Sequence, residues 1–166
     1  MRLAFCFFIF LCSGKAFSLE QPSGQVILSV SGDIKTYNAN NRADFDLAML
    51  NTLPQVSVTT HNPWTDGEHT YTGFSVMDLL KQLKNSGSHL KFTALNQYQA
   101  EIPLSDFTEH GAIMATHRDG LPMSIRNLGP IMVIYPFDQN SDLKIEQYYG
   151  RSIWQIKEMR SFSITE

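Results

Sequence analysis

Hydrophobic positions along the chain change repeatedly between the alternation typical of strands and the wider spacing typical of helices. The alternating and β-branched stretches predict strands over residues 25–31, 55–60, 90–95, 99–104, 112–117, 131–135 and 152–159. Short helical patterns interrupt this series, and the sequence contains no internal repeat, low-complexity tract or long linker. The pattern therefore predicts an α+β domain.

Two helices are predicted from their caps and from the spacing of their apolar residues. The first has Asp44 or its neighbour as its cap and ends at Pro54. Its apolar residues are Phe45, Ala48 and Met49. The second begins at Ser75, which forms a capping-box pattern with Asp78, and Gly87 is its predicted stop. Its apolar residues are Val76, Leu79, Leu80 and Leu83.

Turn-forming residues separate the predicted elements. Asn62-Pro63 and Asp66-Gly67 predict a loop after the strand 55–60, and Arg118-Asp119-Gly120 predicts a turn. Residues 137–150 are polar and aromatic and predict a loop that carries a short helix over residues 142–149. Such a loop either covers a pocket or meets a partner, and the sequence alone favours neither role.

Residues 1–18 have the features of a cleaved secretion signal. Arg2 precedes a short apolar run, and Ala16 and Ser18 form a small-residue cleavage pattern. The run is shorter than the roughly 20 apolar residues that a membrane-spanning helix needs. We therefore expect cleavage after Ser18, which leaves a single domain over residues 19–166.

This signal also contains both cysteines of the chain, Cys6 and Cys12. The mature protein would then contain no thiolate ligand and no disulfide. The signal lacks the paired arginines of the folded-export route, so we expect the chain to cross its membrane unfolded. Export of a cysteine-free domain predicts a bacterial periplasmic location.

The charge of the chain limits its partners. The sequence has 13 lysines and arginines against 16 acidic residues, a formal net charge of −3. Its basic residues are scattered rather than clustered. This net negative charge, without a basic cluster, excludes a general attraction to nucleic acid or to anionic lipid.

Several short motifs follow one another in an order that one known family shares. They are the Leu53-Pro54 pair, the Val- and Thr-rich strand 56–60, Trp64, the aromatic-Gly segment 71–80, the turn Gly120-Leu121-Pro122, the strand entry Gly129-Pro130-Ile131, and Trp154. In this order they resemble the oxidoreductase molybdopterin-binding domain of sulfite oxidases and bacterial periplasmic methionine-sulfoxide reductases, from about residue 45 to residue 160. The resemblance implies a sulfite-oxidase-like α+β fold with mixed β-sheets, two or three short helices and a cofactor bound by loops on one side.

The sequence departs from this family at the position that holds the metal. In catalytic members a cysteine four residues before the loop tryptophan ligates molybdenum, and the matching residue here is Thr60. A threonine hydroxyl stays protonated and binds a metal weakly, whereas a thiolate binds it well. The chain is also shorter than the catalytic domains, and its signal lacks the arginine pair that folded export after cofactor insertion requires. These three departures predict a relative of the family without molybdenum chemistry.

The resemblance places two loops near the family's cofactor pocket. The candidate ligand-binding residues are Thr60, His61, Asn62, Trp64, His117, Arg118 and Arg126. They offer hydrogen-bond donors for a small polar or anionic ligand and an aromatic face for stacking. The alternative is that both histidines are ordinary strand-end residues, the tryptophan belongs to the core and Arg118 is a solvated turn residue.

Other site chemistries find little support in the sequence. No two histidines have a zinc-binding spacing, so no metal site is predicted. No serine lies in a nucleophile elbow, and Ser75 is better explained as a helix cap. Asp66 and Glu68 lie in a polar loop, where two acids are normally solvated.

Three functional hypotheses remain open. The first is an exported, non-catalytic relative that binds a small ligand or a protein, for example as a sensor accessory of a periplasmic or membrane protein, with no cofactor. The second is a molybdopterin-dependent periplasmic oxidoreductase in which Thr60, His61 or water completes the metal sphere. The third is a cofactorless enzyme with His61 or His117 as general base.

Overall fold

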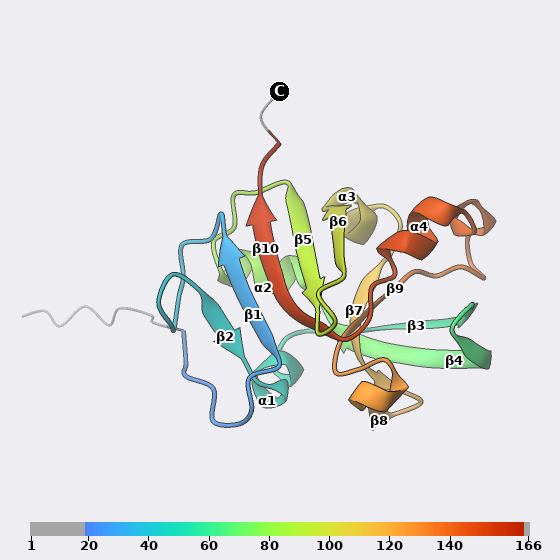
Figure 1. Cartoon of the computed structure of the whole chain (residues 1–166), viewed down its shortest axis with the longest axis horizontal. Coiled ribbons are helices and arrows are strands. Elements are labelled where there is room, and N and C mark those ends of the chain that lie inside the picture. The colour runs from blue at the N-terminus through green and yellow to red at the C-terminus, as the bar shows by residue number, and fades with distance from the viewer. Residues whose placement is uncertain (1–18, 165–166) are drawn as a thin grey trace, which may run out of the picture.

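The computed structural model describes residues 19–164, so the predicted signal peptide lies outside the described residues. Its strands form two five-stranded sheets (Figure 1). The first sheet has the order β2 (Ala43–Phe45), β1 (Leu28–Gly32), β10 (Ile156–Phe162), β5 (His89–Ala94) and β6 (Gln99–Pro103). Because β1 pairs with β10 in parallel while the other pairs are antiparallel, this sheet is mixed, as predicted.

The second sheet is antiparallel and carries five of the seven candidate residues, Thr60, His61, Asn62, His117 and Arg118. It has the order β3 (Gln55–Asn62), β4 (Thr65–Phe74), β7 (Ile113–Arg118) and β8 (Leu121–Pro122), and β9 (Met132–Ile134) also pairs with β7. The predicted loop after the second strand is shorter than expected. Strand β4 already begins at Thr65, so Asp66 and Gly67 lie in a hairpin rather than in a loop.

The helices are short and lie between strands. They are α1 (Leu47–Asn51), α2 (Val76–Gln82), α3 (Ser105–Thr108) and α4 (Glu146–Arg151), with 3-10 turns at Ile125–Asn127 and Ser141–Leu143. The predicted helix in the polar segment is thus present as a 3-10 turn followed by α4. Among residues 19–164, no helix has the length and apolar character needed to cross a membrane.

The helix caps partly follow the sequence prediction. Ser75 caps α2 and accepts a hydrogen bond from the backbone N–H of Asp78 at 3.2 Å, as predicted. The cap of α1 is Asp46 rather than Asp44, which lies in β2. The predicted stop of α2 was also wrong: the helix ends before Lys84, which has a φ of 53°.

Gly87 has a different role from a helix stop. A Cβ atom at this position would collide with the Ser161 side chain and the backbone of Phe162. The glycine therefore allows the segment after α2 to approach the end of β10 closely.

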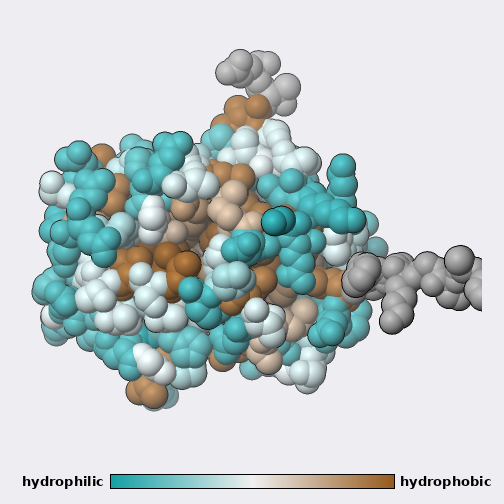
Figure 2. Space-filling view, turned by 180° about the vertical axis from the view of Figure 1, so that it is seen from behind, coloured by the Kyte–Doolittle hydropathy of each residue, from teal (hydrophilic) through white to brown (hydrophobic). Residues whose placement is uncertain are grey.

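The buried apolar residues form two clusters. The larger one packs the first sheet against α2 and the helix-flanking segments, with Leu28, Leu79, Phe92 and Met159 among its members. The smaller one packs against the second sheet and consists of Val58, Tyr71, Ile113, Ala115, Met123, Met132 and Ile134. Seen from behind, the surface is largely hydrophilic, with apolar side chains in recesses (Figure 2).

Trp64 packs against both clusters from the hairpin that joins β3 to β4. This hairpin extends away from the first sheet (Figure 1). Along β3 the burial alternates, so that Thr60 and Asn62 are buried whereas Thr59 and His61 are exposed. One strand therefore presents candidate residues to the interior and to solvent in turn.

Candidate functional site

Thr60 occupies the position that the resemblance assigns to the metal ligand, and its side chain is fully buried. Its hydroxyl donates a hydrogen bond to the carbonyl of His61 at 3.0 Å. It also accepts one from the backbone N–H of Asp138 at 3.1 Å. The hydroxyl is therefore engaged as donor and as acceptor, and the segment around Asp138 lies against it.

His61 lies on the opposite, exposed side of β3 and contacts the same aspartate. Its Nδ1 atom is 2.7 Å from Asp138 Oδ2, and its backbone N–H donates to the same oxygen at 2.6 Å. The Nζ atom of Lys144 is 3.1 Å from Asp138 Oδ1. These donors, the His61 backbone N–H first among them, hold the pKa of Asp138 well below its usual range.

Asn62 shapes the hairpin rather than facing solvent. Its Nδ2 group donates to the hydroxyl of the buried Tyr71 at 2.7 Å. Its Oδ1 atom accepts from the backbone N–H of Trp64 at 3.0 Å and from the Thr65 hydroxyl at 3.2 Å. The asparagine thus fixes the turn that positions the tryptophan.

Trp64 belongs to a group of aromatic side chains at the mouth of a pocket. Its ring centroid is 5.4 Å from that of Trp154 and 6.3 Å from that of Tyr149, the latter edge-to-face. Tyr98 is 51% exposed, and its hydroxyl donates to the carbonyl of Gly150 at 3.2 Å. The pocket has a volume of about 310 Å³ and is lined by Trp64, Ala94, Asn96, Tyr98, Tyr149, Gly150, Ser152 and Trp154.

This lining determines which ligands suit the pocket. It contains aromatic faces, the amide of Asn96 and the hydroxyls of Tyr98, Tyr149 and Ser152, but no charged side chain. Its volume lies at the lower end of the roughly 300–1,000 Å³ found for small-molecule sites. The pocket can hold a small planar molecule through stacking, with polar contacts at the rim.

The second predicted loop lies at the end of β7, two strands away from β3. His117 and Arg118 pair with β4, opposite Thr72 and Tyr71. The separation across two strand spacings is roughly 10 Å. Within residues 19–164, neither residue forms a hydrogen bond or ion pair with the segment from Thr60 to Trp64; His117 Nδ1 lies 2.9 Å from the Thr116 hydroxyl instead.

Arg126 lies on a different element from this segment. It is exposed on the 3-10 turn between β8 and β9. In the part of the chain that the structure describes, its side chain has no ion-pair partner. The structure therefore brings four of the seven candidates together and leaves the other three on neighbouring elements.

Asp119 lies within this second loop and has a contact resembling that of Asp138. Its Oδ2 atom is 2.6 Å from His69 Nδ1, and its Oδ1 atom accepts from the backbone N–H of Thr70 at 3.0 Å. The Thr70 N–H is the main cause of the lowered pKa of Asp119. These bonds tie the turn to β4.

The sequence did not single out Asp138, Tyr71 or Tyr149 as parts of this region. Asp138 is separated from His61 by 77 residues, and no local motif marks it. Tyr149 packs against the larger core cluster, contacts Trp64 and lines the pocket. For this pocket, the sequence indicated Trp154 only as one of the motifs of the family resemblance.

Comparison with known proteins identifies the family. The profile described as the oxidoreductase molybdopterin binding domain matches residues 28–138, which is more than half of the chain. The chain belongs to the oxidoreductase molybdopterin-binding domain family. No curated protein matches it.

Solved structures agree with this fold. The sulfane dehydrogenase SoxCD from Paracoccus pantotrophus superposes with a TM-score of 0.60 at 13% sequence identity. The match covers 81% of this chain but only 37% of the SoxCD chain. The sulfite-oxidase-like α+β fold predicted from the motifs is thereby confirmed.

The residues present do not fit a protein-held molybdenum. Residues 19–166 contain no thiol, and the hydroxyl at the ligand position is buried with both of its hydrogen-bonding functions engaged. A neutral hydroxyl is a poor ligand for a metal that prefers a soft thiolate. We therefore derive no reaction step through this cofactor.

Proposed function

We propose that this family member is an exported, non-catalytic binding module of the periplasm that takes a small planar ligand in the pocket beside Trp64. The observation that carries the proposal is that the Thr60 hydroxyl is already hydrogen-bonded within the fold. At the family's ligand position its hydroxyl bonds the His61 carbonyl and the Asp138 N–H. A residue whose hydrogen bonds are satisfied internally stabilises the fold and offers nothing to a metal.

The chemistry of the pocket supports a ligand with a flat ring. Trp64, Tyr98, Tyr149 and Trp154 present aromatic surface to it, and no arginine, lysine or carboxylate lines it. Aromatic faces attract neutral rings and cations, but they do not compensate a negative charge. The pocket thus favours a neutral or cationic ring over the anionic ligand expected from the sequence.

Exposed Tyr98 makes this proposal testable without disturbing the core. We expect Tyr98→Ala to weaken ligand binding by about fivefold or more, because one stacking face is lost. Native mass spectrometry of the chain purified from its own host identifies the bound molecule, and tryptophan fluorescence follows its affinity. The matched control is Tyr37→Ala, because Tyr37 is 38% exposed and also donates to a backbone carbonyl, but lies outside the pocket.

The proposal fails if the purified chain carries no small molecule and no planar compound quenches its tryptophan fluorescence. It also fails if Tyr98→Ala and Tyr37→Ala have equal effects. In its place a protein partner, such as a sensor protein in the membrane, would become the better hypothesis for the same surface.

Family membership favours a second function, a molybdopterin-dependent periplasmic oxidoreductase with a metal sphere that lacks cysteine. This alternative requires the segment around Asp138 to move, since it lies against Thr60. Purified protein with a pterin-sized mass increment and stoichiometric molybdenum would establish it.

A further inference from the structure

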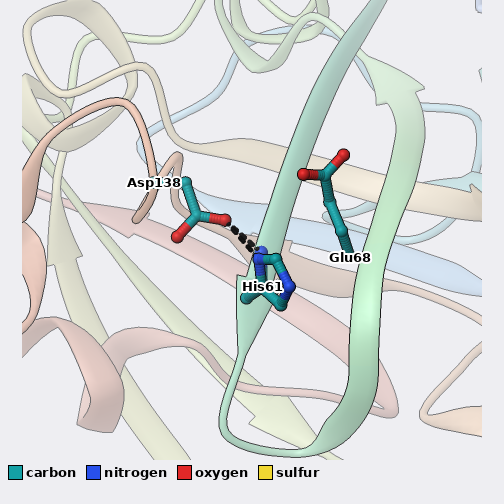
Figure 3. Close-up of side chains that lie close together, drawn as sticks. All are labelled: His61, Glu68 and Asp138. Atoms are coloured by element: carbon teal, nitrogen blue, oxygen red, sulfur yellow. Dashed lines mark hydrogen bonds and ion pairs between the residues drawn. The ribbon is translucent and has the colours of Figure 1, made fainter.

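Three ligand-type side chains converge on the exposed face of the β3–β4 hairpin. His61 comes from β3, Glu68 from β4 and Asp138 from the segment after β9 (Figure 3). One imidazole nitrogen and two carboxylate oxygens lie within 4.8 Å of one another. Among the residues that the structure describes, this is the one group of its kind.

The group carries more negative charge than its neighbours compensate, which favours a bound cation. The Glu68 carboxylate has no hydrogen-bond or ion-pair partner within residues 19–164. Lys144 compensates one carboxylate through Asp138 Oδ1, at 3.1 Å. With a neutral imidazole, one negative charge therefore stays uncompensated, and a bound cation would satisfy it.

The backbone around the group is held in place. On the same exposed face of the hairpin, the hydroxyls of Ser57 and Thr72 are 2.8 Å apart, and those of Thr59 and Thr70 are 2.9 Å apart. The backbone N–H of Asp138 is anchored to Thr60 Oγ1. Ligands on a positioned backbone lose little conformational entropy when they bind an ion.

We propose that His61, Glu68 and Asp138 bind a divalent transition-metal ion of the zinc type. Imidazole combined with carboxylate oxygens suits such ions, and three protein ligands leave an open position for water. The bound ion would connect the hairpin to the segment after β9, which also supplies Tyr149 to the aromatic pocket. This site lies on the exposed face of β3, away from buried Thr60, and it is independent of the proposed ligand function.

A second histidine–aspartate pair gives a matched comparison. His69 Nδ1 lies 2.6 Å from Asp119 Oδ2, which is nearly the same contact as that of His61 with Asp138. Within the described residues, no third ligand completes this second pair into a group of three. Metal binding should therefore depend on the first pair and not on the second.

The test is calorimetric titration of Zn²⁺ into the chain purified after export and treated with a chelator. Iodoacetamide blocks any remaining thiol of Cys6 and Cys12 beforehand, so that these residues add no ligand. We expect binding of a single Zn²⁺ and a loss of affinity of at least about tenfold in Glu68→Gln. This substitution removes no hydrogen bond within residues 19–164, so the folded state is retained.

Three further variants sharpen the result. Asp138→Asn should weaken binding by a similar factor, whereas Asp119→Asn should leave it unchanged. Lys144→Met should strengthen binding, because the ammonium group competes with the metal for Asp138. The proposal is overturned if wild-type protein binds no Zn²⁺, if Glu68→Gln binds as tightly as wild type, or if both aspartate variants weaken binding equally.

Discussion

Two aspartates tie the C-terminal third of the chain to the rest of the molecule, and they do so in opposite surroundings. Asp106 in α3 is 1% exposed and accepts hydrogen bonds from Arg151 at 3.0 and 3.1 Å and from the Tyr135 hydroxyl at 2.5 Å. Asp138 lies at the surface and contacts His61 and Lys144.

The contacts of Asp106 hold the fold together, whereas the partners of Asp138 can be replaced by water or by a ligand. If the carboxylate were removed, the Tyr135 hydroxyl would lose its acceptor in a place that water reaches poorly, whereas Arg151, whose side chain is 23% exposed, would be partly compensated by water. Around Asp138, water can replace each partner, so the contact contributes little to stability. The exposed aspartate therefore stays available to a ligand, whereas the buried one does not.

The largest effect is expected from Asp106→Asn. The substitution leaves Arg151 opposite a neutral amide and removes an acceptor from Tyr135. Breaking a buried ion pair costs about 3–5 kcal/mol, and the partial exposure of Arg151 places the value near the lower limit. Urea unfolding at neutral pH measures it. A loss below about 1 kcal/mol would show that α4 is held by packing instead.

Tyr135→Phe should cost less, about 1.5–3 kcal/mol, since it removes one hydrogen bond to a charged group. Burial, followed by the bond to Asp106, raises the pKa of Tyr135 far above its usual value. Its stabilising contribution is therefore complete below the ordinary tyrosine pKa of about 10 and is lost as the pH rises above it.

This alkaline loss of stability should be smaller in Tyr135→Phe than in wild type. Unfolding midpoints measured on both sides of about pH 10 test the difference. Equal alkaline losses in the two proteins would assign the effect to groups other than Tyr135.

Thr60→Val comes next, with an expected loss of about 1–2 kcal/mol. The substitution keeps the side-chain shape but leaves the backbone N–H of Asp138 without its acceptor. Thr59→Val on the exposed face is the matched control, because its partner Thr70 can bond water instead. An equal effect of both variants would contradict the importance of the buried hydroxyl.

The smallest effect on stability is expected from Asp138→Asn, several times below that of Asp106→Asn. The lowered pKa of Asp138 stabilises the fold above the ordinary carboxyl pKa of about 4, and this contribution is lost as the pH falls toward the lowered value. The variant should therefore lose less stability on acidification than wild type does. Urea midpoints at neutral pH and at about pH 3 provide the measurement.

Much of the scaffold was predictable because its signals are local. The alternation over residues 55–60 and the Ser75 cap depend on neighbouring residues, and the structure shows both as predicted. Asp44 and Asp46 are equally good caps in sequence, and the choice between them was made by the pairing of β2 with β1. That pairing is a long-range contact that local patterns do not contain.

The candidate site was predictable only where the chain folds back locally. Thr60, Asn62 and Trp64 lie within one hairpin, so their proximity follows from a few residues of sequence. The contact of His61 with Asp138 joins segments far apart in sequence, and the polar stretch around Asp138 has no pattern that indicates its partner. Long-range side-chain contacts of this kind require the folded structure.

The most direct test is the molybdenum content of the chain purified from its own host, measured by elemental analysis beside native mass spectrometry. We expect a polypeptide without molybdenum or pterin, beginning at Leu19. We expect the same for Thr60→Cys, because the segment around Asp138 still lies against that position. Stoichiometric molybdenum in the wild-type chain would contradict the account and establish a molybdopterin enzyme whose metal is held without cysteine.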